Sequence, residues 1–173
     1  MKIKFRKLKA SEIDCRIGTI NQRGLSLLLY KDARVDMTIL DETVGPLNWK
    51  REHSRDNRNC IVSIYDEDKK EWVSKEDTGT ESNTEAEKGL ASDSFKRACV
   101  NWGIGRELYS APFIWVKGED ATIEMGKNGK YRCNDKFAVL KLTYNKDGDI
   151  DGLAIGNTKT GKIVFCLMPK EKK

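Results

Sequence analysis

The strongest constraint on the fold of this chain is one helical pattern at residues 78–105. Overlapping capping boxes beginning at Ser82 and Thr84 predict the helix start, and Gly103 predicts its end. On a helical wheel at about 100° per residue, five apolar side chains share one face: Ala91, Phe95, Ala98, Cys99 and Trp102. A helix with one apolar face must bury it, so we expect neighbouring segments to supply a sheet.

Three extended segments precede this helix, at residues 48–54, 59–65 and 71–77. Turn-prone residues separate the first two, and a mixed-charge run separates the last two. Short strands joined by such turns are typical of an antiparallel meander. We expect this meander to receive the apolar face of the helix.

The segments before the meander contain two further helical patterns. Ile13, Ile17 and Ile20 have spacings compatible with one apolar face, which predicts a short helix at residues 10–19. Residues 25–30 predict a strand. Asp32 can then cap a helix that runs to about residue 44.

The remainder of the chain is rich in strand patterns. Strands are predicted at residues 113–116, 121–125, 136–144, 150–156 and 162–167, most of them separated by glycine-containing turns. The predicted fold class is α+β: an antiparallel β-meander packed on a long helix (a β-β-β-α core), with a C-terminal β-hairpin appendage. We expect residues 1–118 to form the core and residues 119–173 a hairpin extension of the same domain, with a short basic tail.

Several classes of function are disfavoured by what the sequence lacks. No stretch approaches the 18 apolar residues of a membrane span, and no apolar run follows the basic N-terminus, so we expect a cytoplasmic protein. The five cysteines include no C-x-x-C pair, which disfavours disulfides and zinc and favours small, mostly buried side chains. His53 is the single histidine and is expected at the surface. With no P-loop either, we expect no catalytic residue, metal or cofactor, and a metal-dependent nuclease is a disfavoured alternative.

Charge distribution points to a polyanionic partner more strongly than total charge does. Lys+Arg outnumber Asp+Glu by 32 to 27, a net charge of +5. The cations cluster at Lys50 and Arg51 in the first meander strand, and at Lys88, Lys96 and Arg97 on the helix. Such groups can neutralise phosphates. The four tryptophans fit core packing better than base stacking, because each lies in a predicted strand or helix.

One family combines these features in this order. Residues 87–98 read E-K-G-L-A-S-D-S-F-K-R-A and are followed by W-G-I-G at 102–105; upstream lie Y-K-D-A-R at 30–34 and G-P-L-N-W at 45–49. Over residues 8–116 the chain resembles the Rad-fifty-two-like single-strand annealing family, especially its compact bacterial and phage members. The resemblance implies a β-β-β-α core, assembly into rings or helical filaments, and single-stranded DNA in a basic groove.

The resemblance also suggests which residues bind DNA. Arg34 matches the groove arginine of the family, and Lys96 matches its groove lysine. Arg97 and Lys88 are weaker candidates. Either of them could equally form an ion pair with a nearby carboxylate, namely Glu85, Glu87 or Asp93. The expected function is ATP-independent binding and annealing of single strands in recombination or repair, by a homo-oligomer and with a single-strand-binding protein as a further partner. A passive protector of single strands or DNA ends, induced by damage, is the alternative. The sequence distinguishes neither these two roles nor a bacterial from a phage origin.

Overall fold

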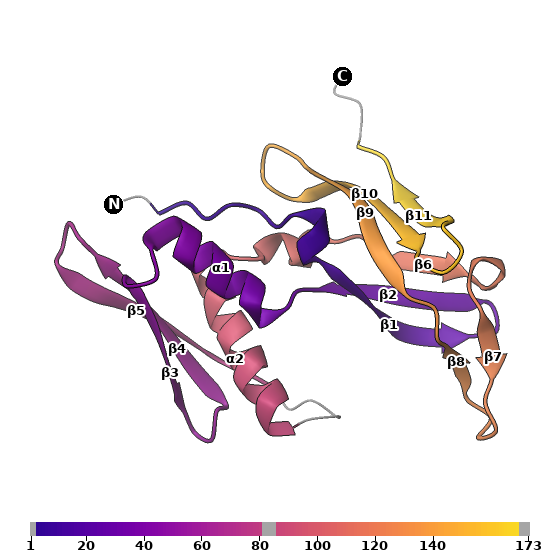
Figure 1. Ribbon diagram of the computed structural model, residues 1–173, viewed down its shortest axis with the longest axis horizontal. Coiled ribbons are helices and arrows are strands. Elements are labelled where there is room, and N and C mark those ends of the chain that lie inside the picture. The colour runs from indigo at the N-terminus through magenta and orange to yellow at the C-terminus, as the bar shows by residue number, and fades with distance from the viewer. Residues whose placement is uncertain (1–2, 81–85, 170–173) are drawn as a thin grey trace. The chain divides into compact units, whose positions relative to one another are not determined.

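The computed structural model describes residues 3–80 and 86–169 (Figure 1). The fold is α+β, with mostly antiparallel sheets and, in these ranges, two α-helices. No helix in the same ranges is long and apolar enough to span a membrane. By their contacts the residues form two compact units, Met1–Lys7 with Asp32–Arg106 and Leu8–Lys31 with Glu107–Lys173. This division by contacts does not say which part of the chain folds on its own. The boundary expected at residue 118, between core and extension, is therefore a proposal.

The first unit contains both α-helices and a three-stranded sheet. Its elements are α1 (Ala33–Val44), β3 (Trp49–Ser54), β4 (Asn59–Asp66), β5 (Glu71–Thr78) and α2 (Ala86–Trp102). The strands pair antiparallel in the order β3-β4-β5, which confirms the predicted meander. The predicted capping boxes around Ser82 and Thr84 involve residues 81–85, which lie outside the described residues.

The apolar face of α2 packs on this sheet, as its helical period predicts. Alternate β4 residues Cys60, Val62 and Ile64 are buried, and α2 contacts both β4 and β5. Phe95 and Cys99 contribute fully buried side chains from the helix. Side chains repeat every 2 residues along a strand and every 3.6 residues along a helix, so the apolar side chains of each element share one face. These two faces form the core of the unit.

Helix α1 begins and ends at the predicted signals. The carboxylate of Asp32 accepts a hydrogen bond from the amide of Arg34 at 2.8 Å, which satisfies a donor that the first helical turn leaves unpaired. Gly45 ends the helix with φ of +85°, a conformation that costs glycine little. Ile39 and Leu40 are fully buried, and α1 contacts α2.

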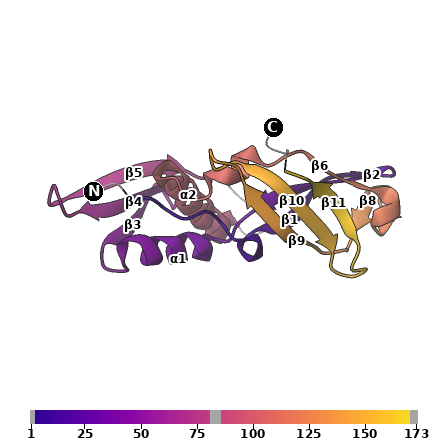
Figure 2. The ribbon, with the colours of Figure 1, turned by 90° about the horizontal axis from the view of Figure 1, so that it is seen from above.

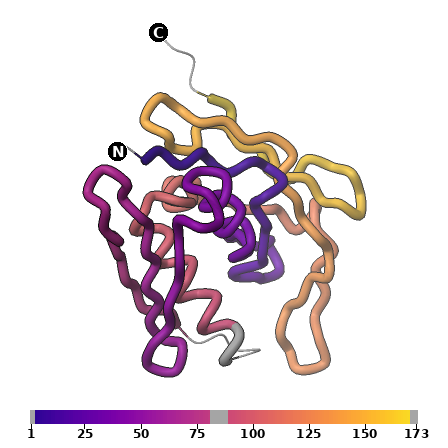
Figure 3. The backbone as a smooth tube through the Cα atoms, turned by 60° about the vertical axis from the view of Figure 1, so that its left-hand side comes forward, coloured from indigo at the N-terminus to yellow at the C-terminus, as the bar shows by residue number. Residues whose placement is uncertain are grey.

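The second unit is built on a six-stranded sheet in the order β11-β10-β9-β1-β2-β6. Figure 2 shows β9, β10 and β11 side by side. The strands are β1 (Asp14–Asn21), β2 (Gly24–Tyr30), β6 (Ile114–Lys117), β9 (Phe137–Tyr144), β10 (Ile150–Asn157) and β11 (Ile163–Leu167). The unit also has a separate hairpin of β7 (Ile123–Met125) and β8 (Tyr131–Cys133), traced in orange in Figure 3. Short 3-10 turns occur at Ala10–Glu12, Arg106–Ser110 and Gly118–Asp120.

The helix predicted at residues 10–19 is wrong. This segment contains a 3-10 turn and most of β1, which pairs with β2 through Ile17↔Leu27 and neighbouring residues. Exposure alternates along the first half of β1, with Cys15 and Ile17 more buried than Asp14 and Arg16. The three isoleucines fit a helix by spacing alone, but β-branched residues suit a strand, and pairing with β2 decides between the two.

The C-terminal strands are sheet partners of the N-terminal hairpin, which the sequence did not predict. β9 pairs with β10 and also with β1, where Asp14 lies opposite Ala138. The strand β8 was also not predicted. The segment after residue 118 therefore completes the sheet that contains β1 and β2, and its core side chains include Val139, Leu153 and Ile155.

The cysteines occupy different environments. Cys60 and Cys99 are buried, Cys15 and Cys133 are half-buried, and Cys166 is exposed. Burial raises the pKa of the Cys60 and Cys15 thiols to about 11, so both are neutral thiols near pH 7. The expectation of mostly buried cysteines is correct for two of the five and wrong for Cys166.

Candidate nucleic-acid interface

Arg34 lies in the first turn of α1 and points into solvent. Its side chain is 85% exposed, and its guanidinium binds Asp32 through Nε–Oδ1 at 2.9 Å and Nη2–Oδ2 at 3.2 Å. The hydrogen bond from the Arg34 side chain, followed by that from its amide, lowers the pKa of Asp32. The ionised carboxylate therefore orients the guanidinium by two contacts, while most of the side chain remains open to a ligand.

Lys96 lies on α2, and its charge acts on the same carboxylate. Its positive charge contributes to the lowered pKa of Asp32 and also acts on Asp93, one helical turn before it. Among the described residues, no hydrogen bond or ion pair engages the Lys96 ammonium. The ammonium thus acts on both carboxylates through its charge, without a direct bond to either.

Arg97 is held by Asp93. Its Nε lies 3.0 Å from Asp93 Oδ2, an i,i+4 ion pair on α2. Burial alone would raise the pKa of Asp93, but the Thr80 amide, the Arg97 guanidinium and the Lys96 charge together lower it. Of the partners that the sequence left open for Arg97, the structure assigns Asp93.

These five residues, Arg34, Lys96, Arg97, Asp32 and Asp93, are called here the α1–α2 cluster. It contains three cations and two carboxylates, so it carries a net positive charge. The carboxylates orient the arginines, and the excess charge favours an anion. A phosphodiester is the matching ligand, because guanidinium and ammonium groups donate charge-assisted hydrogen bonds to phosphate oxygens.

Lys50 and Arg51 do not join this cluster through their contacts. They are neighbours on β3 and so point to opposite faces of the meander. The Lys50 ammonium lies 5.2 Å from the ring centre of Trp72, whereas the Arg51 guanidinium lies 4.8 Å from the ring centre of Phe95. The side chain of Lys88, a residue of α2, lies outside what the structure describes.

The tryptophans mostly pack, as expected. Trp49 stacks on Phe95 with ring centres 6.1 Å apart, and Trp102 donates a hydrogen bond to the Val62 carbonyl at 2.9 Å. Trp72 differs, because it is exposed on the outer face of the meander and contacts Tyr65 edge-on at 5.5 Å. The spacing of apolar residues in the sequence did not predict that Trp72 is exposed.

His53 is half-buried, which corrects its expected place at the surface. It points to the same side of β3 as Arg51, and its Nδ1 lies 3.5 Å from the hydroxyl of Ser94 on α2. Desolvation, followed by the charge of Arg51, lowers the pKa of His53 below its ordinary value of 6.5. The imidazole is therefore neutral near pH 7 and contributes no positive charge to an anion site.

This burial makes a measurable prediction. We expect the NMR signal of the His53 imidazole to titrate with a midpoint below pH 6.5. Arg51→Gln should raise this midpoint only part of the way to 6.5, because desolvation lowers the pKa of His53 more than the charge of Arg51 does. Since the unfolded state binds the proton more tightly, unfolding free energy should fall as the pH drops through 6.5 towards the native pKa. A midpoint at or above 6.5 in the folded protein would contradict the placement of His53.

Sequence reasoning did not include the two carboxylates of the α1–α2 cluster among the candidate site residues. Asp32 was predicted only as a helix cap, and Asp93 only as one of three acidic neighbours of Arg97. Local signals existed for both: D-A-R at a helix start brings the arginine back to the capping carboxylate, and D-x-x-x-R places an ion pair on one helix face. The proximity of Lys96 to Asp32 carried no such signal, because it depends on the packing of α1 against α2.

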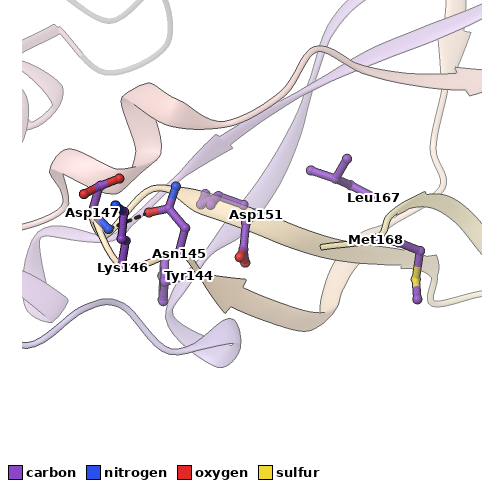
Figure 4. A pocket seen from close by; sticks show the side chains of 8 residues that line it. Tyr144, Asn145, Lys146, Asp147, Asp151, Leu167 and Met168 are labelled. Carbon is purple, nitrogen blue, oxygen red and sulfur yellow. Dashed lines mark hydrogen bonds between the residues drawn. The ribbon is translucent and has the colours of Figure 1, made fainter. Parts of the chain in front are cut away.

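A pocket in the second unit is less suited to a phosphate chain. It has a volume of about 520 Å³ and lies at the turn between β9 and β10, next to the end of β11 (Figure 4). Its charged lining residues are Lys146, Asp147 and Asp151, one cation against two carboxylates. The side chain of Asn145 accepts hydrogen bonds from the amides of Asp147 and Asp149, so it stabilises the turn.

Part of the chain matches a known protein family. Residues 59–125 match the model of the Rad52/22 family of double-strand break repair proteins. This segment is Rad52-like. It begins with β4, includes Lys96 and Arg97, and confirms the family resemblance expected from the sequence. Arg34, Lys50 and Arg51 precede the Rad52-like segment.

Curated relatives agree with this assignment. The chain is 35% identical over 97 residues to the single-stranded DNA-binding protein DdrA of Deinococcus radiodurans, covering 55% of this chain and 46% of the relative. It is 46% identical over 54 residues to DdrA of Deinococcus deserti, covering 30% of this chain and 27% of that relative. The match thus spans less than half the length of either relative. No solved structure matches this chain significantly.

Proposed function

We propose that this protein binds single-stranded DNA and anneals complementary strands, without ATP, in DNA recombination or repair. The observation that carries the proposal is the exposed guanidinium of Arg34, which the carboxylate of Asp32 orients while the charge of Lys96, distant in sequence, acts on the same carboxylate. The Rad52-like segment and the DdrA relatives, named as single-stranded DNA-binding proteins, support the choice of ligand.

The proposed mechanism requires no group transfer, so we propose a non-enzymatic protein without a cofactor. Cations of the α1–α2 cluster hold phosphates, and the release of counterions from the strand favours binding. A strand held by its backbone exposes its bases and loses its hairpins. Base pairing then supplies the free energy of annealing, and the protein lowers the kinetic barrier by reducing repulsion between strands.

The assembly of the protein is part of the same proposal. A single cluster with three cations neutralises few phosphates, whereas copies arranged in a ring or helical filament form a continuous groove. We propose the β-β-β-α segment as the DNA-binding core and residues 119–173 as its extension. The location that fits this role is the cytoplasm of a bacterial or phage-infected cell, and a single-strand-binding protein is the further partner proposed there.

A passive protector of strands or ends is the second candidate. The observation that favours it is that both relatives are named single-stranded DNA-binding proteins, a name that states binding and does not mention annealing. Such a protein would cover the strand tightly and shield its ends from exonucleases. It would not accelerate pairing.

The experiment that separates the two roles is a pairing assay with two complementary labelled oligonucleotides, without ATP or metal. We expect wild-type protein to accelerate pairing at low salt, and the acceleration to fall as salt rises, because phosphate contacts are screened. A neutral protein at equal concentration is the control. Binding without acceleration would favour the passive role, and the absence of binding at low salt would contradict both roles.

A further inference from the structure

One face of the second unit's sheet is apolar and open to solvent. Strands β1, β2 and β6 are neighbours, and their inward residues, including Leu25, Leu27, Ile114 and Val116, are almost fully buried. The residues between them point outward. Leu28, Tyr30 and Phe113 are 46%, 40% and 77% exposed, and Phe113 stacks on the half-buried Trp115 with ring centres 6.3 Å apart. We call Leu28, Tyr30, Phe113 and Trp115 the outer patch.

Glycines make room for this patch and hold its aromatic pair in place. A Cβ on Gly24 would lie 2.8 Å from two ring atoms of Trp115, so the indole ring lies directly over the bare backbone of β2. A Cβ on Gly18 would lie 3.2 Å from Leu28 Cγ. The rings are thus packed against the sheet before any partner binds. Binding then costs less side-chain conformational entropy.

The charges around the outer patch are of both signs. On the same face of β1, Asp14 lies opposite Tyr30 and Arg16 opposite Leu28. At the other end, Lys117 is 3.6 Å from Glu119. Exposed Lys136 lines a pocket with Asp14 and Arg16, so the rim has three cations and two carboxylates. The apolar centre, rather than the charge of the rim, therefore distinguishes this face from a phosphate-binding site. An apolar centre with a rim of mixed charge is typical of a protein–protein contact.

The rim is also complementary to itself. Asp14 and Arg16 are two residues apart on one strand and carry opposite charges. When two identical faces meet about a two-fold axis, each residue can contact a different residue of the other copy. Arg16 of one copy can then face Asp14 of the other, and the apolar centres bury each other. A second copy of this chain therefore satisfies both the apolar centre and the rim.

We propose that the outer patch pairs two copies of this chain face to face. The pairing uses the second unit and does not depend on the α1–α2 cluster or on DNA. A two-fold contact closes after two copies, so it makes a dimer of single chains and, when its axis is perpendicular to that of a ring, joins two rings into one double ring.

The test is the molar mass of the full chain in solution, measured by light scattering after size-exclusion chromatography. We expect Phe113→Glu to halve the mass and to weaken the pairing by about a hundredfold, because it places an uncompensated carboxylate in the apolar contact. Leu47→Glu is the matched control: Leu47 is 89% exposed, lies in the first unit and should leave the mass unchanged. Circular dichroism checks that each variant is folded.

A charge exchange tests the same contact without touching the aromatic pair. We expect Arg16→Asp to weaken the pairing and the double variant Asp14→Arg/Arg16→Asp to restore it, since the exchange regenerates opposite charges across a two-fold contact. The proposal is overturned if wild-type protein has the same mass as Phe113→Glu, or if the exchange fails to restore pairing. It is also overturned if Phe113→Glu keeps its mass but loses affinity for single-stranded DNA, which would make the patch a base-stacking surface.

Discussion

Arg34→Ala/Lys96→Ala will bind single-stranded DNA about a hundredfold more weakly at low salt and lose the acceleration of strand pairing. Both side chains act at Asp32, Arg34 through two hydrogen bonds and Lys96 through its charge. Removing them leaves Asp32 with no cation from the cluster beside it. The site then carries two carboxylates and one arginine, and a phosphate is repelled where it was attracted.

The salt dependence gives this prediction its sharpest form. Two lost phosphate contacts should lower the slope of log affinity against log salt by about 1.4, at about 0.7 for each contact with a single strand. The control variant Lys127→Ala/Lys130→Ala removes equal charge from two exposed lysines in the β7–β8 turn. We expect it to retain most of the affinity. Equal losses in both variants would mean that net charge, not the α1–α2 cluster, determines binding.

Phe95→Ala will lower the free energy of unfolding by about 3–5 kcal/mol. The Phe95 side chain is fully buried between α2 and the meander, stacked against Trp49 and covered by the Arg51 guanidinium at 4.8 Å. Truncation leaves a cavity and removes the ring that these two neighbours contact. Urea-induced unfolding, followed by tryptophan fluorescence, measures the loss.

Two further variants on α2 calibrate this measurement. Phe95→Leu retains most of the volume and should cost about 1 kcal/mol. Ser92→Ala, at an exposed position of the same helix, should change stability by less than about 0.5 kcal/mol. A loss below 1 kcal/mol for Phe95→Ala would contradict the packing of α2 on the sheet. Because Lys96 is adjacent to Phe95, we also expect Phe95→Ala to weaken DNA binding through displacement of the helix.

Local signals in the sequence determined most of the secondary structure of the first unit. Asp32 and Gly45 bound α1, alternation defines β3, β4 and β5, and the apolar positions of α2 repeat with a helical period. These features depend on residues within a few positions of one another, so a single sequence reveals them. The resemblance carried by residues 87–105 agrees with the family model that matches residues 59–125, and it pointed to Lys96.

Tertiary structure decided what depends on partners distant in the chain. Residues 10–19 carry a spacing that fits a helix, and the pairing of β1 with β2 and β9 makes them a strand. Likewise, Lys50 and Arg51 are adjacent in sequence but point to opposite faces of the meander. Arg34 and Lys96 are distant in sequence, yet both act on the carboxylate of Asp32. The physical reason is that local periods set which side chains share a face, whereas packing between elements sets which faces meet.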